Sequence, residues 1–361
     1  MYILSIETSC DDTAVSIIKA GNCGRFEILS NVVSSQVKLH RKYGGVYPSL
    51  AKREHQKNLP VVCKKAFWEA RRKLKSGKPD LVAVTAGPGL EPCLWTGINF
   101  AEEVAEKLKV PIVPVNHVEA HILVNFLETE YKTQNKKCLL PAICLVVSGG
   151  HTQLILMDDI GKYKVIGETR DDAAGECFDK AARILGLGYP GGPAIAAKAA
   201  EYKKQGAKYK IQLPRPMIHT KDYDFSFSGL KTAVLYEFRS RAPKIRKTKE
   251  YIREISHEIQ AAIIDVLIRK TMKAAKGYKA KSVILGGGVT ANKELRKQLE
   301  NKIEKEIPGI RYLTPKAEYS TDNGVMTGIA AYFKWLNLSN KKKGWKKIEA
   351  NANLKLESDE E

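Results

Sequence analysis

The feature that most constrains the fold is a strand–turn–strand unit that occurs twice in the chain. Residues 2–8 (YILSIET) indicate a buried strand, which the polar turn SCDD links to a second strand at 13–19. Residues 142–147 (AICLVV) indicate another buried strand, which the turn SGGHT links to a strand at 153–157. A unit of this kind at the start of each half predicts two similar halves around a shared cleft.

Strands and helices alternate after both units, which predicts an α/β architecture. We expect further strands at 25–35, 80–87, 111–115, 162–168 and 282–286, and helices at 48–75 (interrupted by Pro60), 92–108, 117–128, 173–187, 192–205, 228–240, 248–276, 291–305 and 322–337. This is the layout of the bilobal ASKHA superfamily, which contains actin, the sugar kinases and the heat-shock chaperone ATPases.

The length of 361 residues exceeds what one compact core usually organises, so two domains are expected. The polar stretch 129–140 has no clear period and is the predicted boundary. The first half then covers residues 1–135, with the last helix, 322–337, packed back onto it. The second half covers 136–321 and includes helical insertions. Residues 338–361 are predicted to form a charged tail that is frayed or disordered.

The composition is that of an ordinary globular protein with an excess of positive charge. No apolar run approaches the roughly 20 residues that span a bilayer, and the N-terminus lacks the pattern of a secretory signal, so no membrane partner is expected. Seven cysteines without a C-x-x-C pair fit a reducing compartment, which predicts a cytoplasmic protein. The net charge of +20 favours polyanionic partners, although a solvated basic surface explains it nearly as well.

The strongest chemical signal is the segment NHVEAH at 116–121. His117 and His121 are four residues apart and share one face of a helix, which suits a metal site; a packing or hydrogen-bonding role is the alternative. In the zinc-protease pattern H-E-x-x-H the glutamate directly follows the first histidine. Here Glu119 lies about 200° around the helix from His117, at ~100° per residue. It points away from the histidine face, which argues against such a peptidase.

Two glycine-rich segments, 148–150 (SGG) and 286–295 (GGGVTANKEL), each follow a buried strand. Glycines let a backbone approach a phosphate closely, and a helix N-terminus adds free N–H groups. Neither segment matches the P-loop or the Rossmann pattern, so tight structural turns remain the alternative. Asn292 suits either a helix cap or a nucleotide contact.

Acidic residues gather at the first turn and at 171–180 (DDAAGECFDK). Glu7, Asp11 and Asp12 flank the first turn, where carboxylates either orient a ligand or build the turn. Asp179, near the middle of a predicted helix, either faces solvent or has a functional role.

Taken together, these motifs resemble the TsaD family of tRNA threonylcarbamoyladenosine synthesis, in its bacterial and organellar branch. The matching segments are ILSIETSCDDTAV, SSQVKLHRKYGGVYPSLAKREH, TAGPGL, VNHVEAH, LVVSGGHTQL, DDAAGECFDKAARILGLGYPGG, FSFSGLKTA, GGGVTANKELR and STDNGVM. They cover roughly residues 3–332. The chain departs from the family pattern at Glu91 and Trp95, where small or aliphatic residues are usual, and at Ser320, where many members have cysteine.

The resemblance implies an ASKHA fold and transfer of threonylcarbamoyl from threonylcarbamoyl-AMP to N6 of the adenosine 3′ of the anticodon, in tRNAs reading ANN codons. It implies metal ligands at His117, His121 and Asp322, a set that suits Fe(II) or Zn(II). It implies substrate contacts from Val146, Val147, Ser148, Gly149, Gly150, Asp179, Gly192 and Asn292. Glu7 and Asp11 are candidates for accepting a proton or arranging the site. A TsaB-like paralogue and a TsaE-like ATPase are the expected protein partners.

Three other functions compete with this interpretation. A metalloprotease is disfavoured by the position of Glu119. A small-molecule kinase or ATPase of the same fold accounts for the glycine segments but leaves NHVEAH unexplained. A non-catalytic tRNA-binding scaffold is the third. Incubation with tRNA and the adenylate distinguishes them.

Overall fold

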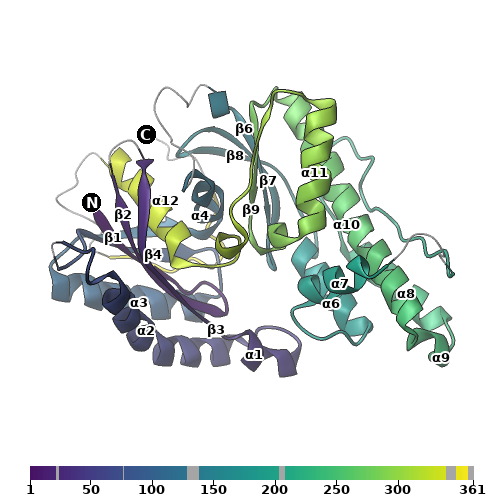
Figure 1. Ribbon diagram of the computed structural model, residues 1–361, viewed down its shortest axis with the longest axis horizontal. Coiled ribbons are helices and arrows are strands. Elements are labelled where there is room, and N and C mark those ends of the chain that lie inside the picture. Colours follow the sequence, from purple (N-terminus) through teal and green to yellow (C-terminus); the bar gives the residue numbers. More distant parts are fainter. Residues whose placement is uncertain (22–23, 76, 128–137, 203–207, 339–346, 357–361) are drawn as a thin grey trace.

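The structure is a computed structural model that describes residues 1–361 except 22–23, 76, 128–137, 203–207, 339–346 and 357–361. Two five-stranded sheets form its centre (Figure 1). The first sheet contains β1 (Tyr2–Glu7), β2 (Asp12–Ala20), β3 (Phe26–Ser35), β4 (Leu81–Gly87) and β5 (Ile112–Asn116). The second contains β6 (Ala142–Val147), β7 (Thr152–Asp159), β8 (Lys162–Glu168), β9 (Ser282–Gly286) and β10 (Arg311–Leu313).

The two sheets have the same strand order. The first reads β3-β2-β1-β4-β5, and the second reads β8-β7-β6-β9-β10 from the corresponding edge. In both, the first strand pairs antiparallel with the second and parallel with the fourth, as Ile6 does with Val15 and Val84. The two strand–turn–strand units are therefore β1–β2 and β6–β7, and the predicted α/β class is confirmed.

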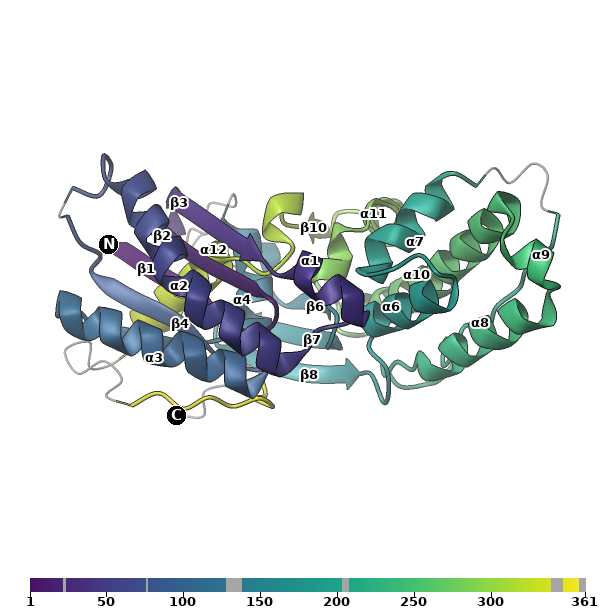
Figure 2. The same cartoon turned by 90° about the horizontal axis from the view of Figure 1, so that it is seen from below.

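Helices cover the outer faces of both sheets (Figure 2). The first half has α1 (Val37–His40), η2 (Arg41–Tyr43), α2 (Pro48–Ala70), α3 (Glu91–Leu108), α4 (His117–Leu123) and η3 (Val124–Phe126). The second has α6 (Ala174–Ile184), α7 (Gly191–Ala200), α8 (Ser228–Ser240), α9 (Pro243–Arg246), α10 (Lys249–Gly277), η4 (Gly288–Ala291), α11 (Lys293–Glu306) and η5 (Ala317–Tyr319), before α12 (Gly324–Asn337). Within the described ranges no helix is long and apolar enough to cross a membrane.

Alternate residues of the central strands enter different apolar layers, because side chains on a strand alternate between faces. Leu4 and Ile6 of β1 pack in the outer core under α2 and α3, whereas Ile3 joins a core between the two sheets. In β6, Ile143 faces the outer core of the second half and Cys144 faces the shared core. Apolar side chains of α4 and α12 complete the shared core. These two helices therefore occupy the layer between the sheets.

Two glycines let α12 lie very close to the first sheet. A Cβ at Gly324 would lie 2.6 Å from Oγ of Ser16, and one at Gly328 would lie 2.9 Å from Cδ1 of Ile18. The hydroxyl of Ser5 donates a hydrogen bond to the carbonyl of Gly324 at 2.6 Å. A side chain at either glycine would push the helix, and the residues just before it, away from β1.

The predicted interruption at Pro60 is wrong, since α2 continues through it. An interior proline costs a helix about 3 kcal/mol or more. Here the neighbours Leu59, Val62 and Cys63 are buried against the first sheet. Tertiary packing therefore outweighs the local penalty.

The tail prediction is wrong for residues 347–356, which pack against the first half and run past α3 (Figure 2). Ile348 and Leu356 are only 3% and 8% exposed, because both side chains enter apolar cores. The rest of the predicted tail beyond Leu338 lies outside the described residues. So does most of the predicted boundary at 129–140, which stays a prediction.

Candidate metal centre and neighbouring glycine turns

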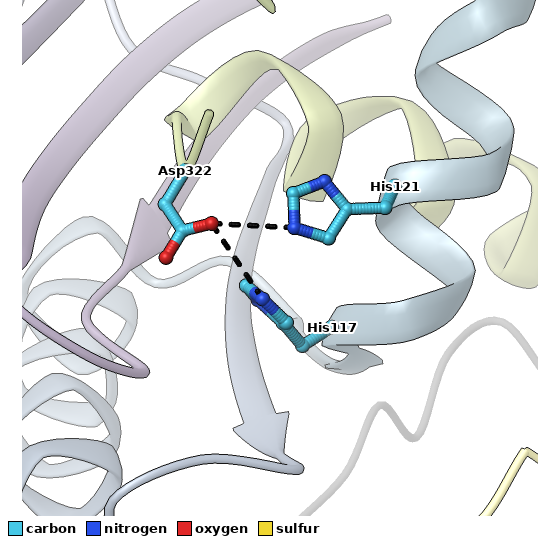
Figure 3. Close-up of side chains that lie close together, drawn as sticks. All are labelled: His117, His121 and Asp322. Carbon is cyan, nitrogen blue, oxygen red and sulfur yellow. Dashed lines mark ion pairs between the residues drawn. The ribbon is translucent and has the colours of Figure 1, made fainter. Parts of the chain in front are cut away.

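His117, His121 and Asp322 come together between the two sheets (Figure 3). Both histidines lie on α4, and Asp322 lies two residues before α12. Oδ1 of Asp322 is 3.2 Å from Nε2 of His121 and 3.6 Å from Nε2 of His117. The two rings meet edge to face, with centroids 4.6 Å apart. One potential ligand atom from each residue therefore points to a common position.

The start of α4 is fixed by Asn116. This residue ends β5, and its side-chain oxygen caps the helix by accepting hydrogen bonds from the N–H groups of Val118 (2.8 Å) and Glu119 (3.3 Å). Such a cap satisfies N–H groups that a helix start leaves unpaired. It sets the first turn of α4, and with it the position of His117.

A buried carboxylate on β1 orients His117 from the other side. Oε2 of Glu7 lies 3.2 Å from Nδ1 of His117, and the hydroxyl of Ser9 lies 3.1 Å from the same nitrogen. Glu7 also accepts hydrogen bonds from the N–H of Ser9 and the hydroxyl of Thr85, both at 2.6 Å. These contacts turn Nε2 of His117 towards Asp322, the arrangement that orients histidine ligands in metal sites.

The electrostatics of the group favour a cation at its centre. Burial alone would lower the pKa of His117, but Asp322 and Glu7 outweigh it and raise that pKa to about 9. Burial would raise the pKa of Asp322, but His117 and His121 hold it at about 2. The metal-free site thus keeps two carboxylates ionised around an imidazolium, and a divalent ion can take the place of that positive charge.

His121 provides a direct test of whether a metal fits. Burial and the neighbouring His117 lower its pKa, so the ring is neutral. The side chain is 1% exposed; among the described residues its Nδ1 has no hydrogen-bond partner, and its Nε2 faces Oδ1 of Asp322 at 3.2 Å. Unpaired buried polar atoms are rare because they are costly. A neutral imidazole nitrogen that faces a carboxylate can coordinate a metal together with that carboxylate. The three residues therefore fit a divalent ion.

The other predicted acid, Asp11, lies in the β1–β2 turn near this group. Burial first and Asp322 second raise its pKa, and its Oδ2 has no hydrogen-bond partner within the described part of the chain. The same two causes raise the pKa of Asp12 to about 7. The turn thus holds two carboxyl groups whose charge is unfavourable where no cation is bound.

Glycines of the second half lie in close contact with the helix that carries the histidines, and with one another's strands and turns. A Cβ at Gly286 would lie 2.7 Å from the carbonyl oxygen of His121, so the end of β9 touches α4. Gly287, with φ of 90°, lies against the carbonyl of Val147, and Gly175 lies against that of Ser148. The turn at 148–150 therefore sits where β6, β9 and α6 converge. Val146 and Val147 are buried, whereas Gly149 and Gly150 have no atom within 4 Å of an added Cβ.

The three remaining predicted contact residues, Asp179, Gly192 and Asn292, each lie at the start of a helix or bond to one. Asp179 accepts a hydrogen bond from the N–H of Gly191 at 2.6 Å, at the start of α7. Gly192 has open space around its Cα and lies in a segment beside a cavity of about 430 Å³. Asn292 caps α11 by accepting from two N–H groups, and its amide donates to Gln260 at 2.9 Å. Asp179 and Asn292 thus have structural partners already.

Glu119 has a partner on another element. Its Oε1 accepts a hydrogen bond from the hydroxyl of Tyr163 on β8 at 2.9 Å. A protease-like arrangement would instead require this carboxylate at the metal.

Comparison with known proteins agrees with the geometry. The family model described as "TsaD: tRNA N6-adenosine threonylcarbamoyltransferase" matches residues 27–329. The chain belongs to the TsaD family. Curated members of that name from Syntrophomonas wolfei and Thermosipho africanus are 45% and 44% identical to it. These alignments cover 93% and 92% of this chain, and 93% and 94% of the relatives.

Solved structures show the same fold at much lower identity. A full-length HypF in a phosphate- and nucleotide-bound form matches with a TM-score of 0.57 at 13% identity, over 94% of this chain and 47% of that one. HypF from T. kodakarensis matches with a TM-score of 0.56 at 14% identity, over 92% and 48%. The two equivalent sheets and these neighbours fit the ASKHA-type bilobal fold expected for TsaD.

Several residues around this TsaD site were not predicted from the sequence. Ser9, Thr85 and Asn116 orient the site through the contacts described above. Only Asn116 had a readable signal, because a polar residue directly before a helical pattern is typical of a cap. The departure at Ser320 is accommodated locally, since its hydroxyl accepts a hydrogen bond from Arg296 at 2.7 Å.

Proposed function

We propose that this chain transfers a threonylcarbamoyl group from threonylcarbamoyl-AMP to N6 of the adenosine 3′ of the anticodon, in tRNAs that read ANN codons. The observation that carries the proposal is the position of the His117–His121–Asp322 group, directly against the glycine turns of the second half, in a chain of the TsaD family. We place the reaction in the cytoplasm, where tRNA is available.

The nucleophile in this reaction is the RNA amine. Its nitrogen forms a bond to the carbamoyl carbon, the bond from that carbon to the phosphate oxygen of AMP breaks, and the amine loses a proton. The protein therefore needs to hold and orient two substrates and accept one proton; it needs no nucleophile of its own.

Asp11 and Glu7 are assigned different parts of this task. Asp11 has an unpaired carboxylate oxygen and a raised pKa, both of which suit a group that accepts a proton. Glu7 is fully buried and bonded to His117, which suits a residue that arranges the site.

His117, His121 and Asp322 would hold one divalent ion, Fe(II) or Zn(II), with positions left for substrate. Such an ion supplies Lewis-acid polarisation of a carbonyl or phosphoryl oxygen. The chain itself buries both histidines, keeps His121 neutral and keeps Asp322 ionised, and an uncharged imidazole and a carboxylate both favour binding of a cation.

The donor is assigned to the second half. We propose contacts to its nucleotide and threonyl parts from Val146, Val147, Ser148, Gly149, Gly150, Asp179, Gly192 and Asn292. The open space at Gly149 and Gly150 supports this assignment, because a phosphate could approach the backbone there without meeting a side chain. Asp179 and Asn292 would act partly through the helix starts that they fix.

Two kinds of macromolecular partner follow. The acceptor is tRNA, and the net charge of +20 suits a polyanion. A TsaB-like paralogue and a TsaE-like ATPase are proposed as protein partners. We expect the chain alone to modify tRNA poorly and to turn over when both are added. Full multiple turnover by the chain alone would contradict the partner requirement.

The deciding experiment is incubation of the protein and these partners with unmodified tRNA and threonylcarbamoyl-AMP, followed by nucleoside mass spectrometry. The modified adenosine should form with the wild-type chain and not with Asp322→Ala. Absence of the product with a folded, metal-loaded wild-type chain and active partners would refute the function. Among the residues described, nothing favours a metalloprotease, a kinase or a passive scaffold.

A further inference from the structure

Residues 347–356, here called the strap, lie against the back of the proposed metal site. Four hydrogen bonds join the strap to described residues of the first half. The strap donates two of them, from the N–H of Ile348 to Oε1 of Glu102 at 3.3 Å and from the N–H of Asn351 to the carbonyl of Ala86 at 2.9 Å. It accepts the other two, at the carbonyl of Ala352 from the N–H of Gly89 at 3.2 Å and at the carbonyl of Lys355 from the side-chain amide of Asn116 at 3.1 Å. Buried side chains of Ile348 and Leu356 anchor both ends.

The first route from the strap to the metal ligands passes through Asn116. The side chain of this residue is 8% exposed and uses both of its polar atoms. Its oxygen caps α4, the helix that carries His117 and His121, while its nitrogen donates to the carbonyl of Lys355. The strap therefore holds the amide in the orientation in which its oxygen faces the helix.

The second route passes through the turn after β4. Gly87 has φ of 154°, and a Cβ there would lie 2.0 Å from the carbonyl oxygen of Asn351, so the strap and the turn are in backbone contact. Gly89, two residues on, packs against Ser9, and the N–H of Leu90 donates to the carbonyl of Ser9 at 2.8 Å. The hydroxyl of Ser9 in turn lies 3.1 Å from Nδ1 of His117.

The first route ends at the first turn of α4, at the N–H groups of Val118 and Glu119, and the second ends at the ring of His117. We infer that Asn116 is a positioning residue for the metal ligands and that the strap acts on these ligands through Asn116 and, separately, through Ser9. This inference rests on the proposed metal site. It adds a contribution from a segment that is far from the histidines in the sequence and that makes no contact with the ligand atoms.

The test measures Co(II) binding to the full-length protein by titration and by the visible absorption spectrum of the bound ion, which reports the ligand geometry. Asn116→Asp and Asn116→Ser both keep an oxygen that caps α4 but remove the amide that bonds to Lys355. Asn351→Pro removes the N–H that bonds to Ala86. Asn353→Ala is the control, because it keeps the N–H that donates to Asn351 and the side chain of Asn353 makes no hydrogen bond to the described residues.

We expect Asn116→Asp, Asn116→Ser and Asn351→Pro each to weaken Co(II) binding about tenfold and to change the spectrum, since partners that orient ligands are worth 10–100-fold in metal affinity. The Asn116→Ser/Asn351→Pro double variant should lose about the product of the two single losses, because the two changes break separate routes to the metal ligands. Asn353→Ala should bind as the wild type does. Thermal unfolding of each variant checks that it is folded.

The outcomes are distinct. Failure of the wild-type chain to bind Co(II) would overturn the metal site itself. Wild-type binding by Asn116→Asp would mean that the residue is only a helix cap and would overturn the inference. A double variant that loses no more than either single variant would mean that the two routes do not act separately, which overturns the second route. If Asn351→Pro fails to fold, the two Asn116 variants decide alone.

Discussion

The two halves of the molecule share one sheet topology but use its equivalent positions for different chemistry. The turn between the first two strands carries carboxylates in the first half (Asp11) and glycines in the second (Gly149). The connection after the last strand carries the histidines in the first sheet, and in the second it carries Asp322 and leads into α12. The metal group is thus built from corresponding connections after the two sheets, and Asp322 reaches the histidines because α12 packs back onto the first sheet.

Two acidic residues, Asp12 in the first half and Glu306 in the second, also affect the stability of the fold in opposite directions. Burial and Asp322 raise the pKa of Asp12 in the first half, so its charge opposes folding. In the second half, hydrogen bonds from Lys276 and Lys302 lower the pKa of Glu306 to about 2, so its charge favours folding. Asp12 thus carries unfavourable negative charge near the proposed cation site, whereas the charge of Glu306 is favourable. The predictions below test this division.

The largest effect is expected from the ligands that join the halves. His117→Ala and Asp322→Ala should each reduce bound metal to a trace and lower threonylcarbamoyl transfer by about 100-fold or more, because loss of a direct ligand exceeds loss of its supporting partner. Elemental analysis and the tRNA assay measure both. Glu119→Ala is the control and should keep full metal content, since its carboxylate bonds to Tyr163. Full metal content in His117→Ala would remove the site.

The next effect separates two adjacent glycines of the second half. Gly287→Ala should lower the free energy of unfolding by about 2–4 kcal/mol, because the residue has φ of 90° and its Cβ would lie 2.4 Å from the carbonyl oxygen of Val147. At Gly288 the nearest atom, on Thr321, is 4.0 Å from an added Cβ. Gly288→Ala should therefore stay within about 0.5 kcal/mol of the wild type. Equal stability of the two variants in urea denaturation would contradict the tight packing of β9 on β6.

A smaller effect, with a defined pH dependence, is expected at Asp12. Its folded pKa of about 7 exceeds the unfolded value, so the folded state binds more protons between about pH 4 and 7 and stability falls as pH rises through that window. At pH 8, metal-free Asp12→Asn should be more stable than the wild type by on the order of 1–3 kcal/mol, and the gain should vanish near pH 4.

Glu306→Gln is the comparison for Asp12 and should behave oppositely. The depressed pKa of Glu306 gives stability that is present above about pH 4.5 and lost as pH falls towards 2, so the variant should be less stable at neutral pH. Thermal unfolding across pH 3–9 measures both variants. A loss of stability in Asp12→Asn at pH 8 would show that its charge is compensated in the fold.

The smallest effect concerns the basic surface of the second half. Lys244→Glu and Lys247→Glu together should weaken tRNA binding several-fold and reduce the slope of log K against log[salt] by roughly one per lost phosphate contact. Both side chains are exposed, whereas Arg246 donates to the carbonyls of Arg239 and Arg241 and is left unchanged. Adenylate binding should not change. An unaltered salt slope would assign these lysines to ordinary solvation.

The sequence predicts those parts of the fold that local pattern controls. The buried strand β6 is a continuous apolar run, β1 is mostly apolar, and His117 and His121 share a helix face by spacing alone. The three residues of β10 form a strand only because they pair with β9, so no periodicity marks them. Asp322 reaches the histidines through the packing of α12 between the sheets, which spacing cannot show. Its assignment depended on resemblance to relatives, and the contacts of Glu7 and Ser9 required coordinates.

The position of Asp322 at the head of α12 has a consequence for how the protein is made. Both sheets and both histidines leave the ribosome before this residue does, since α12 follows them in the chain. Until α12 emerges, one face of the first sheet lacks the helix that Gly324 and Gly328 bring against Ser16 and Ile18. The nascent protein therefore exposes an apolar sheet face and holds two histidines without their carboxylate. The complete group of proposed ligands forms only after α12 has docked, so binding of the proposed metal belongs to the last stage of synthesis.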